Sequence, residues 1–137
     1  MIRVTPELRT AAERLLKLEA AGGRGTRKLP TAALVSERLR RVLSTLLGAV
    51  GFKALLARAV TLAKAEVPTL SALQIAADSS LVGLSEDDDF GDGEVVLVAH
   101  ILGLLVTFIG EALMLRLVND AWPKARLDDL DFDKDEP

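Results

Sequence analysis

The sequence predicts an all-α domain, a small bundle of about four helices around a long apolar C-terminal helix. Half of the 137 residues are apolar but only 4% are aromatic, so the apolar content is largely Leu, Val and Ala, which suit helices packed through aliphatic side chains. In three segments the apolar residues recur every three or four positions, as on one face of a helix. A fourth segment, 95–118, is apolar almost throughout.

The first predicted helix spans about residues 6–21. Thr5 can cap its N-terminus, Pro6 suits the first helical position, and the glycines at 22 and 23 end it. One face carries the apolar residues Leu8, Ala11, Ala12, Leu15 and Leu18.

Two further helices, at about 31–48 and 52–65, are expected to form an antiparallel hairpin. Gly48 and Gly51 mark a tight break or a close crossing between them, and Pro68 stops the second helix. The apolar stripe of the first consists of Val35, Leu39, Val42, Leu43, Leu46, Leu47 and Val50.

Residues 69–92 form an irregular insert, with either a short hairpin turning at 78–80 or a ragged helix. Its acidic end fails as a calcium loop, because Phe90 occupies a ligand position whichever glycine is counted as the sixth residue. We therefore expect a solvated acidic loop, in which Asp92 and Glu94 favour the N-terminus of the helix that follows.

The fourth helix is predicted to run without interruption from about 93 to 121, ending before Pro123. Its polar residues and glycines fall on one face, where small residues would let another backbone approach closely. They are His100, Gly103, Thr107, Gly110 and Glu111. Thr107 can donate a hydrogen bond to the carbonyl of Gly103.

The same segment raises the alternative of a single membrane span at 95–118. Its uncharged run has only 16 residues before Glu111, and a central acidic residue opposes insertion by about 2.5–3.5 kcal/mol. A helix apolar on all sides is also what a soluble bundle places at its centre. The soluble bundle is favoured, and a membrane contact stays open.

We expect one domain at 1–125 and an acidic, flexible tail at 126–137. Charge is divided along the chain: residues 1–65 carry a net +9 and residues 66–137 a net −12, which together give −3. The two halves could neutralise each other within the fold, or the basic half could bind an anionic partner.

Most catalytic chemistries lack their residues in this sequence. There is no Cys and only one His, and the glycines of "GGRGTRKLP" lack the Lys-Ser/Thr of a phosphate-binding loop. No enzymatic activity, cofactor or metal site is expected. The N-terminal residues show no targeting segment, so a cytoplasmic location is expected.

The expected function is that of a non-enzymatic helical interaction module that binds a protein partner or itself. Alternatives are binding of nucleic acid or an anionic surface through the basic half, and the single membrane span. Candidate interaction residues are Arg38, Arg41, His100, Glu111, Trp122, Leu130 and Phe132. Glu111 is expected to pair with Arg41 or Arg58, His100 to be a satisfied core imidazole, and Trp122 to anchor a helix end.

Overall fold

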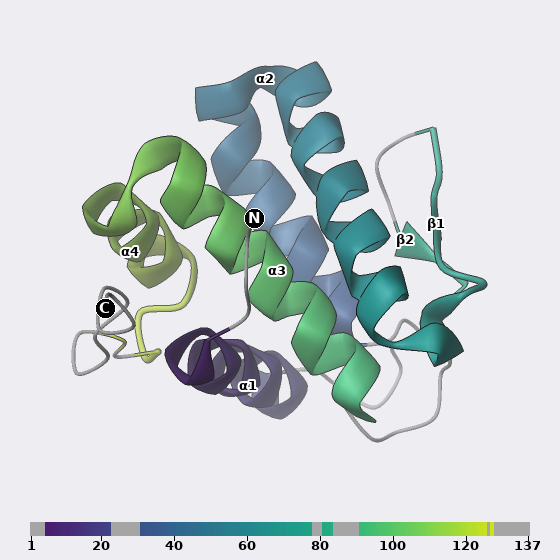
Figure 1. The fold of residues 1–137 in the computed structure, drawn as a ribbon. Coiled ribbons are helices and arrows are strands. Elements are labelled where there is room, and N and C mark those ends of the chain that lie inside the picture. The colour runs from purple at the N-terminus through teal and green to yellow at the C-terminus, as the bar shows by residue number, and fades with distance from the viewer. Residues whose placement is uncertain (1–4, 23–30, 78–80, 84–90, 126, 128–137) are drawn as a thin grey trace, which may run out of the picture.

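The computed structural model describes residues 5–22, 31–77, 81–83, 91–125 and 127. The described chain is all-α apart from one small hairpin, which confirms the predicted fold class (Figure 1). Its elements are α1 (Pro6–Gly22), α2 (Thr31–Glu66), the 3-10 turn η1 (Pro68–Leu70), β1 (Gln74–Ile75), β2 (Leu81–Val82), α3 (Gly91–Ile109) and α4 (Glu111–Ala121).

The N-terminus of α1 is capped as the sequence predicts. The Leu8 N–H donates to Thr5 Oγ1 at 3.2 Å, which satisfies one of the amides that has no partner within the helix. The predicted apolar face is buried from Leu8 to Leu15, together with Leu16. With this face inward, α1 lies across one end of the bundle (Figure 1).

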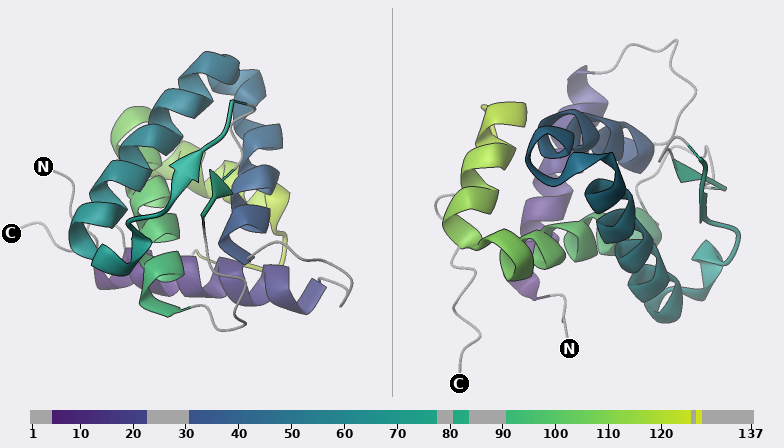
Figure 2. Two further views of the ribbon diagram at one scale, coloured as in Figure 1. Left: turned by 90° about the vertical axis from the view of Figure 1, so that its right-hand side faces the viewer. Right: turned by 90° about the horizontal axis from the view of Figure 1, so that it is seen from above.

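The predicted helical hairpin is a single element, α2, that is bent at Gly48. This residue has φ 78° and ψ 163°, a conformation that reverses the chain and that residues with a Cβ rarely adopt. The two arms run in opposite directions from this bend, which lies at the end of the bundle away from α1 (Figures 1 and 2). The first arm buries Val35, Leu39 and Leu43.

The predicted apolar stripe of the first arm does not continue into the core at the bend. Leu46 and Val50 are exposed, because the chain turns away from α3 at Gly48 before a further helical turn can pack. We call residues 46–50 the α2 bend.

The most apolar helix, α3, is the centre of the core. Every residue from Glu94 to Leu105 is buried, and α1, α2 and α4 all pack against the helix (Figure 2). This enclosure explains why the sequence of α3 is apolar on all sides and lacks an amphipathic pattern.

The continuous helix predicted for 93–121 is wrong at Gly110. This residue has φ 91°, so α3 ends at Ile109 and α4 starts in a new direction at Glu111. A Cβ at Gly110 would meet no atom within 4 Å, so the glycine makes a corner and is not a close helix crossing. The predicted bond from Thr107 Oγ1 to the Gly103 carbonyl is present at 3.0 Å.

The insert contains the short hairpin that was one of the two alternatives. Strands β1 and β2 pair antiparallel, with Gln74 opposite Val82 and Ile75 opposite Leu81. The hairpin lies against α2 on the side away from α4 (Figure 2). The predicted turn at 78–80 and most of the acidic loop, 84–90, lie outside the described residues.

Candidate functional site

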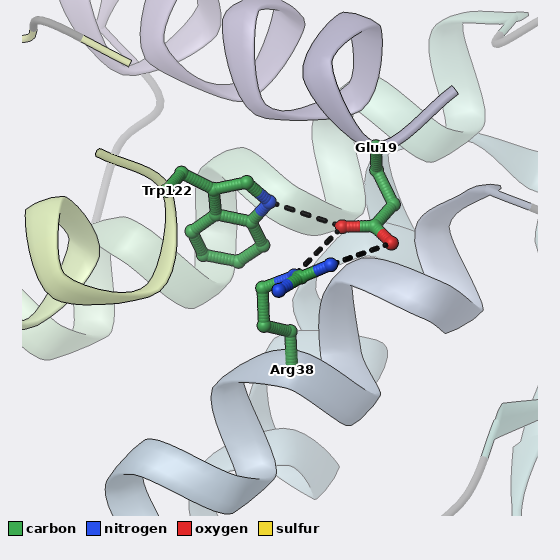
Figure 3. A network of polar contacts seen from close by, with 3 residues as sticks. All are labelled: Glu19, Arg38 and Trp122. Carbon is green, nitrogen blue, oxygen red and sulfur yellow. Dashed lines mark hydrogen bonds and ion pairs between the residues drawn. The ribbon is translucent and has the colours of Figure 1, made fainter. Parts of the chain in front are cut away.

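The structure brings two of the predicted interaction residues, Arg38 and Trp122, together around Glu19 (Figure 3). Arg38 Nε donates to Glu19 Oε1 at 2.9 Å, and Arg38 Nη2 donates to Glu19 Oε2 at 3.3 Å. The indole Nε1–H of Trp122 donates to Glu19 Oε1 at 3.0 Å. We call these three residues the Glu19 cluster; it joins α1, the first arm of α2 and the end of α4.

The cluster compensates a buried charge. The Glu19 side chain is only 7% exposed, and a carboxylate in that position requires hydrogen-bond donors, here a guanidinium and an indole. The guanidinium carbon of Arg38 also lies 5.6 Å from the centroid of the Trp122 ring, within the range of a cation–π contact. These contacts hold the C-terminal ends of α1 and α4 against α2.

Sequence reasoning missed Glu19, although the pattern contained a signal. Glu19 lies four residues after Leu15 and therefore continues the apolar face of α1. An acidic residue on a buried face requires a partner, and the cluster supplies it. Trp122 is buried at the C-cap of α4, as expected for a residue that anchors a helix end.

A hollow of about 380 Å³ opens beside the cluster. Its walls combine apolar side chains with the cationic side chains of Arg38 and Lys124. The lining residues are Leu18, Glu19, Ala21, Arg38, Ala121, Trp122, Pro123 and Lys124. The volume lies at the small end of the range for ligand sites in proteins.

Arg41 lines a smaller recess of about 70 Å³, which Arg38 and Glu19 also border. Glu37, which also lines this recess, pairs with Arg40 one helical turn ahead. The guanidinium of Arg41 is exposed, so Arg41 belongs to the surface of α2 and not to the core.

His100 is buried on α3, apart from the Glu19 cluster. Its Nε2 lies 3.0 Å from Glu66 Oε1, so Nε2 carries the hydrogen and donates to the carboxylate. Its Nδ1 is buried and has no partner among the described residues, so the expectation of a satisfied imidazole is half right. The contact ties α3 to the last residue of α2.

Glu94 lies in the first turn of its own helix, α3, as expected, and its side chain also caps a different helix. Its Oε1 accepts the backbone N–H of Ala32 at 3.1 Å, in the first turn of α2. Burial raises the pKa of Glu94 to about 7, and the bond from Ala32 opposes that rise in part. The sequence could not reveal this contact, because 62 residues separate its two partners.

The remaining predicted residues lie elsewhere. Glu111 is half-buried at the first position of α4, where the helix dipole favours an acidic side chain; its pairing with Arg41 or Arg58 stays a prediction. Leu130 and Phe132 lie outside the described residues.

One described helix, α2, is long and apolar enough to cross a membrane, judged by length and composition alone. Only 33% of its most apolar stretch of 18 residues is buried. The segment 95–118, which was the alternative membrane span, is divided by the corner at Gly110, and α3 is a shorter apolar helix.

The described residues form no group of three His, Asp or Glu side chains that could hold a metal ion. No protein-family model, curated protein or solved structure matches the chain.

Proposed function

We propose that this protein is a non-enzymatic, cytoplasmic interaction module that binds a protein partner in the hollow beside the Glu19 cluster. The single observation that carries the proposal is the convergence of Arg38, Trp122 and Lys124 around that hollow. Trp and Arg are the residue types that contribute most often to binding at protein interfaces.

The lining indicates the kind of partner segment that would fit. Leu18, Ala121 and Pro123 offer apolar contacts, while Arg38 and Lys124 supply positive charge at the rim. The bonds to Glu19 use the Nε and Nη2 groups of Arg38, whose side chain is still 43% exposed. A guanidinium has five N–H donors, so Arg38 can also bind a carboxylate from outside. The hollow suits an apolar side chain next to an acidic residue.

The state of Glu19 supports a binding role over a catalytic one. Its carboxylate is buried and accepts three hydrogen bonds, so it has little capacity to take a proton from a substrate. His100, the one imidazole of the chain, makes its contact with Glu66 instead.

The proposal is tested by filling the hollow. Ala121→Phe places a large side chain among the lining residues, and Lys124→Glu reverses the charge at the rim. Proteins retained from a lysate of the native host by each variant are compared with those retained by the unchanged protein. Lys17→Glu, an equal charge reversal on an exposed part of α1, is the matched control.

We expect the retained amount of one partner to fall at least about tenfold with Ala121→Phe and with Lys124→Glu. A tenfold fall corresponds to about 1.4 kcal/mol of binding free energy. The Lys17→Glu control should retain the partner. Equal retention by all variants would contradict the proposal, as would a protein that is monomeric by light scattering and retains nothing reproducibly. If the chain associates with itself, the same variants should dissociate the oligomer.

A further inference from the structure

The α2 bend exposes apolar side chains at the end of the bundle away from α1 (Figure 1). Val50 is 84% exposed and Leu46 is 50% exposed. A Cβ at Gly48 would meet no atom within 4 Å, so the space beside this glycine is open, although Leu47 next to it packs partly against the core. Leu46 and Val50 form a convex apolar tip.

Two further large apolar side chains are exposed outside the bend. Phe108 is 60% exposed, in the last turn of α3 just before the corner at Gly110. Of the large apolar side chains that are exposed among the described residues, Leu46 and Val50 belong to the α2 bend, whereas Phe108 is on α3 and Val82 is on β2.

The part of α2 around the bend carries positive charge only, since Glu37 and Glu66 lie outside it. Between residues 38 and 65 there are six cationic residues and no acidic one. They are Arg38, Arg40, Arg41, Lys53, Arg58 and Lys64. Arg41, Lys53 and Arg58 are exposed, so their charges face solvent.

The cations lie at a defined depth behind the apolar tip. Lys53 is five residues from Gly48 and Arg41 is seven, so at the helical rise they lie about 7 and 10 Å behind the bend. An amphipathic helix that lies in the plane of a bilayer interface buries its apolar face to about 5–10 Å, and we take the same depth for an inserted tip. With the tip inserted, these two side chains would lie at the level of the lipid headgroups.

We infer that the α2 bend docks on the surface of an anionic lipid bilayer, with Leu46 and Val50 in the interface and Arg41 and Lys53 against the headgroups. A convex tip suits a planar lipid surface, whereas a protein partner or a second copy would need an acidic pocket to receive it. Lys and Arg near an anionic surface add to the apolar attraction. The contact needs no span, so the bundle stays folded on the membrane.

This inference goes beyond the proposed partner site and does not depend on it. Arg38, at the hollow, lies ten residues or about 15 Å along α2 from Gly48. Both sites could be occupied at once, which would hold a protein partner at a membrane surface.

The first test measures sedimentation of the whole protein with vesicles of phosphatidylcholine, alone or with an equal part of phosphatidylglycerol. We expect binding to the anionic vesicles that falls at least about tenfold in the double variant Leu46→Glu/Val50→Glu, and that weakens in Lys53→Glu. Val82→Glu, at an exposed valine on β2, and Lys17→Glu are matched controls that should bind normally.

The second test measures insertion directly. The chain has no Cys, so Val50→Cys and the control Val82→Cys each carry one environment-sensitive fluorophore. We expect a blue shift with anionic vesicles at position 50 only. Failure of the unchanged protein to bind, or equal binding by Leu46→Glu/Val50→Glu, overturns the inference. The inference is also overturned if the protein binds duplex DNA in a way that depends on Lys53 but not on Val50. It is overturned as well if the protein forms a dimer that Val50→Glu dissociates.

Discussion

Helix α3 and the α2 bend are both strongly apolar, but protein covers only the first. Residues 94–105 of α3 are buried on all sides, whereas Val50 and Leu46 in the bend face solvent. The difference arises from the neighbours of each segment. Helices α1, α2 and α4 pack against α3, whereas Gly48 reverses the chain at the bend and leaves Leu46 and Val50 exposed. Apolar composition alone therefore does not identify a core, and the neighbours of a segment decide whether its residues stabilise the fold or remain free to bind.

The largest effect should come from equal truncations in these two regions. Leu102→Ala removes a fully buried side chain of α3 and should lower the free energy of unfolding by about 3–5 kcal/mol, since a cavity remains. Leu46→Ala should lower it by less than about 1 kcal/mol. Urea denaturation measures both, and similar losses would contradict the difference in burial.

The Glu19 cluster helps to close the bundle around α3, and its loss should have the next largest effect. Glu19→Ala leaves the indole N–H of Trp122 buried without its acceptor and should destabilise the protein by about 2 kcal/mol. Arg40→Ala, which breaks the more exposed pair with Glu37, is the control and should change stability by less than about 0.5 kcal/mol. Equal losses in thermal melts would show that the cluster is not a closing contact.

The two glycine corners should respond alike to substitution. A Cβ at Gly48 or Gly110 meets no atom within 4 Å, so the Ala variants should lower stability only through backbone strain, by about 1–3 kcal/mol each. A much larger loss at Gly110, measured by urea denaturation, would mean that the corner beside α3 packs more closely than the one in the α2 bend.

The pH dependence of stability should reveal the carboxyl group of Glu94, which attaches α3 to α2. Its pKa is raised from 4.5 to about 7 in the folded protein, so the folded state holds the proton more tightly than the unfolded state. The stabilisation from this group is full below pH 4.5 and is lost as pH rises through 7. Between pH 5 and 8 the free energy of unfolding should fall by about 1 kcal/mol more in the unchanged protein than in Glu94→Gln. This is less than the full pKa shift would give, because solvent screens part of the charge. A constant difference between the two proteins over that range would contradict the assignment.

Sequence reasoning succeeded where a signal was local. The cap at Thr5, the break at Gly48 and the apolar periodicity of α1 depend on residues within a few positions of one another, and each is confirmed. The corner at Gly110 was missed because a glycine inside an apolar helix can equally indicate close packing. Its conformation depends on the direction in which α4 must run.

The candidate site was only partly predictable. Arg38 and Trp122 were selected separately as residue types common at interfaces, but 84 positions separate them and only the fold brings them together. Glu19 was identifiable as an acid on an apolar face, while Glu94 acts through a contact between two helices that are distant in sequence. Contacts of that kind are determined by packing and leave no local pattern.

The most direct test of the difference between α3 and the α2 bend is thiol reactivity in detergent-free buffer. Val98→Cys and Val50→Cys make the same substitution in a cysteine-free chain, at a fully buried and a largely exposed position. We predict that the thiol at position 50 reacts with a maleimide as fast as a free thiol and that the thiol at position 98 reacts only after unfolding. Rapid reaction at position 98 in the folded protein, or protection at position 50, would contradict this account.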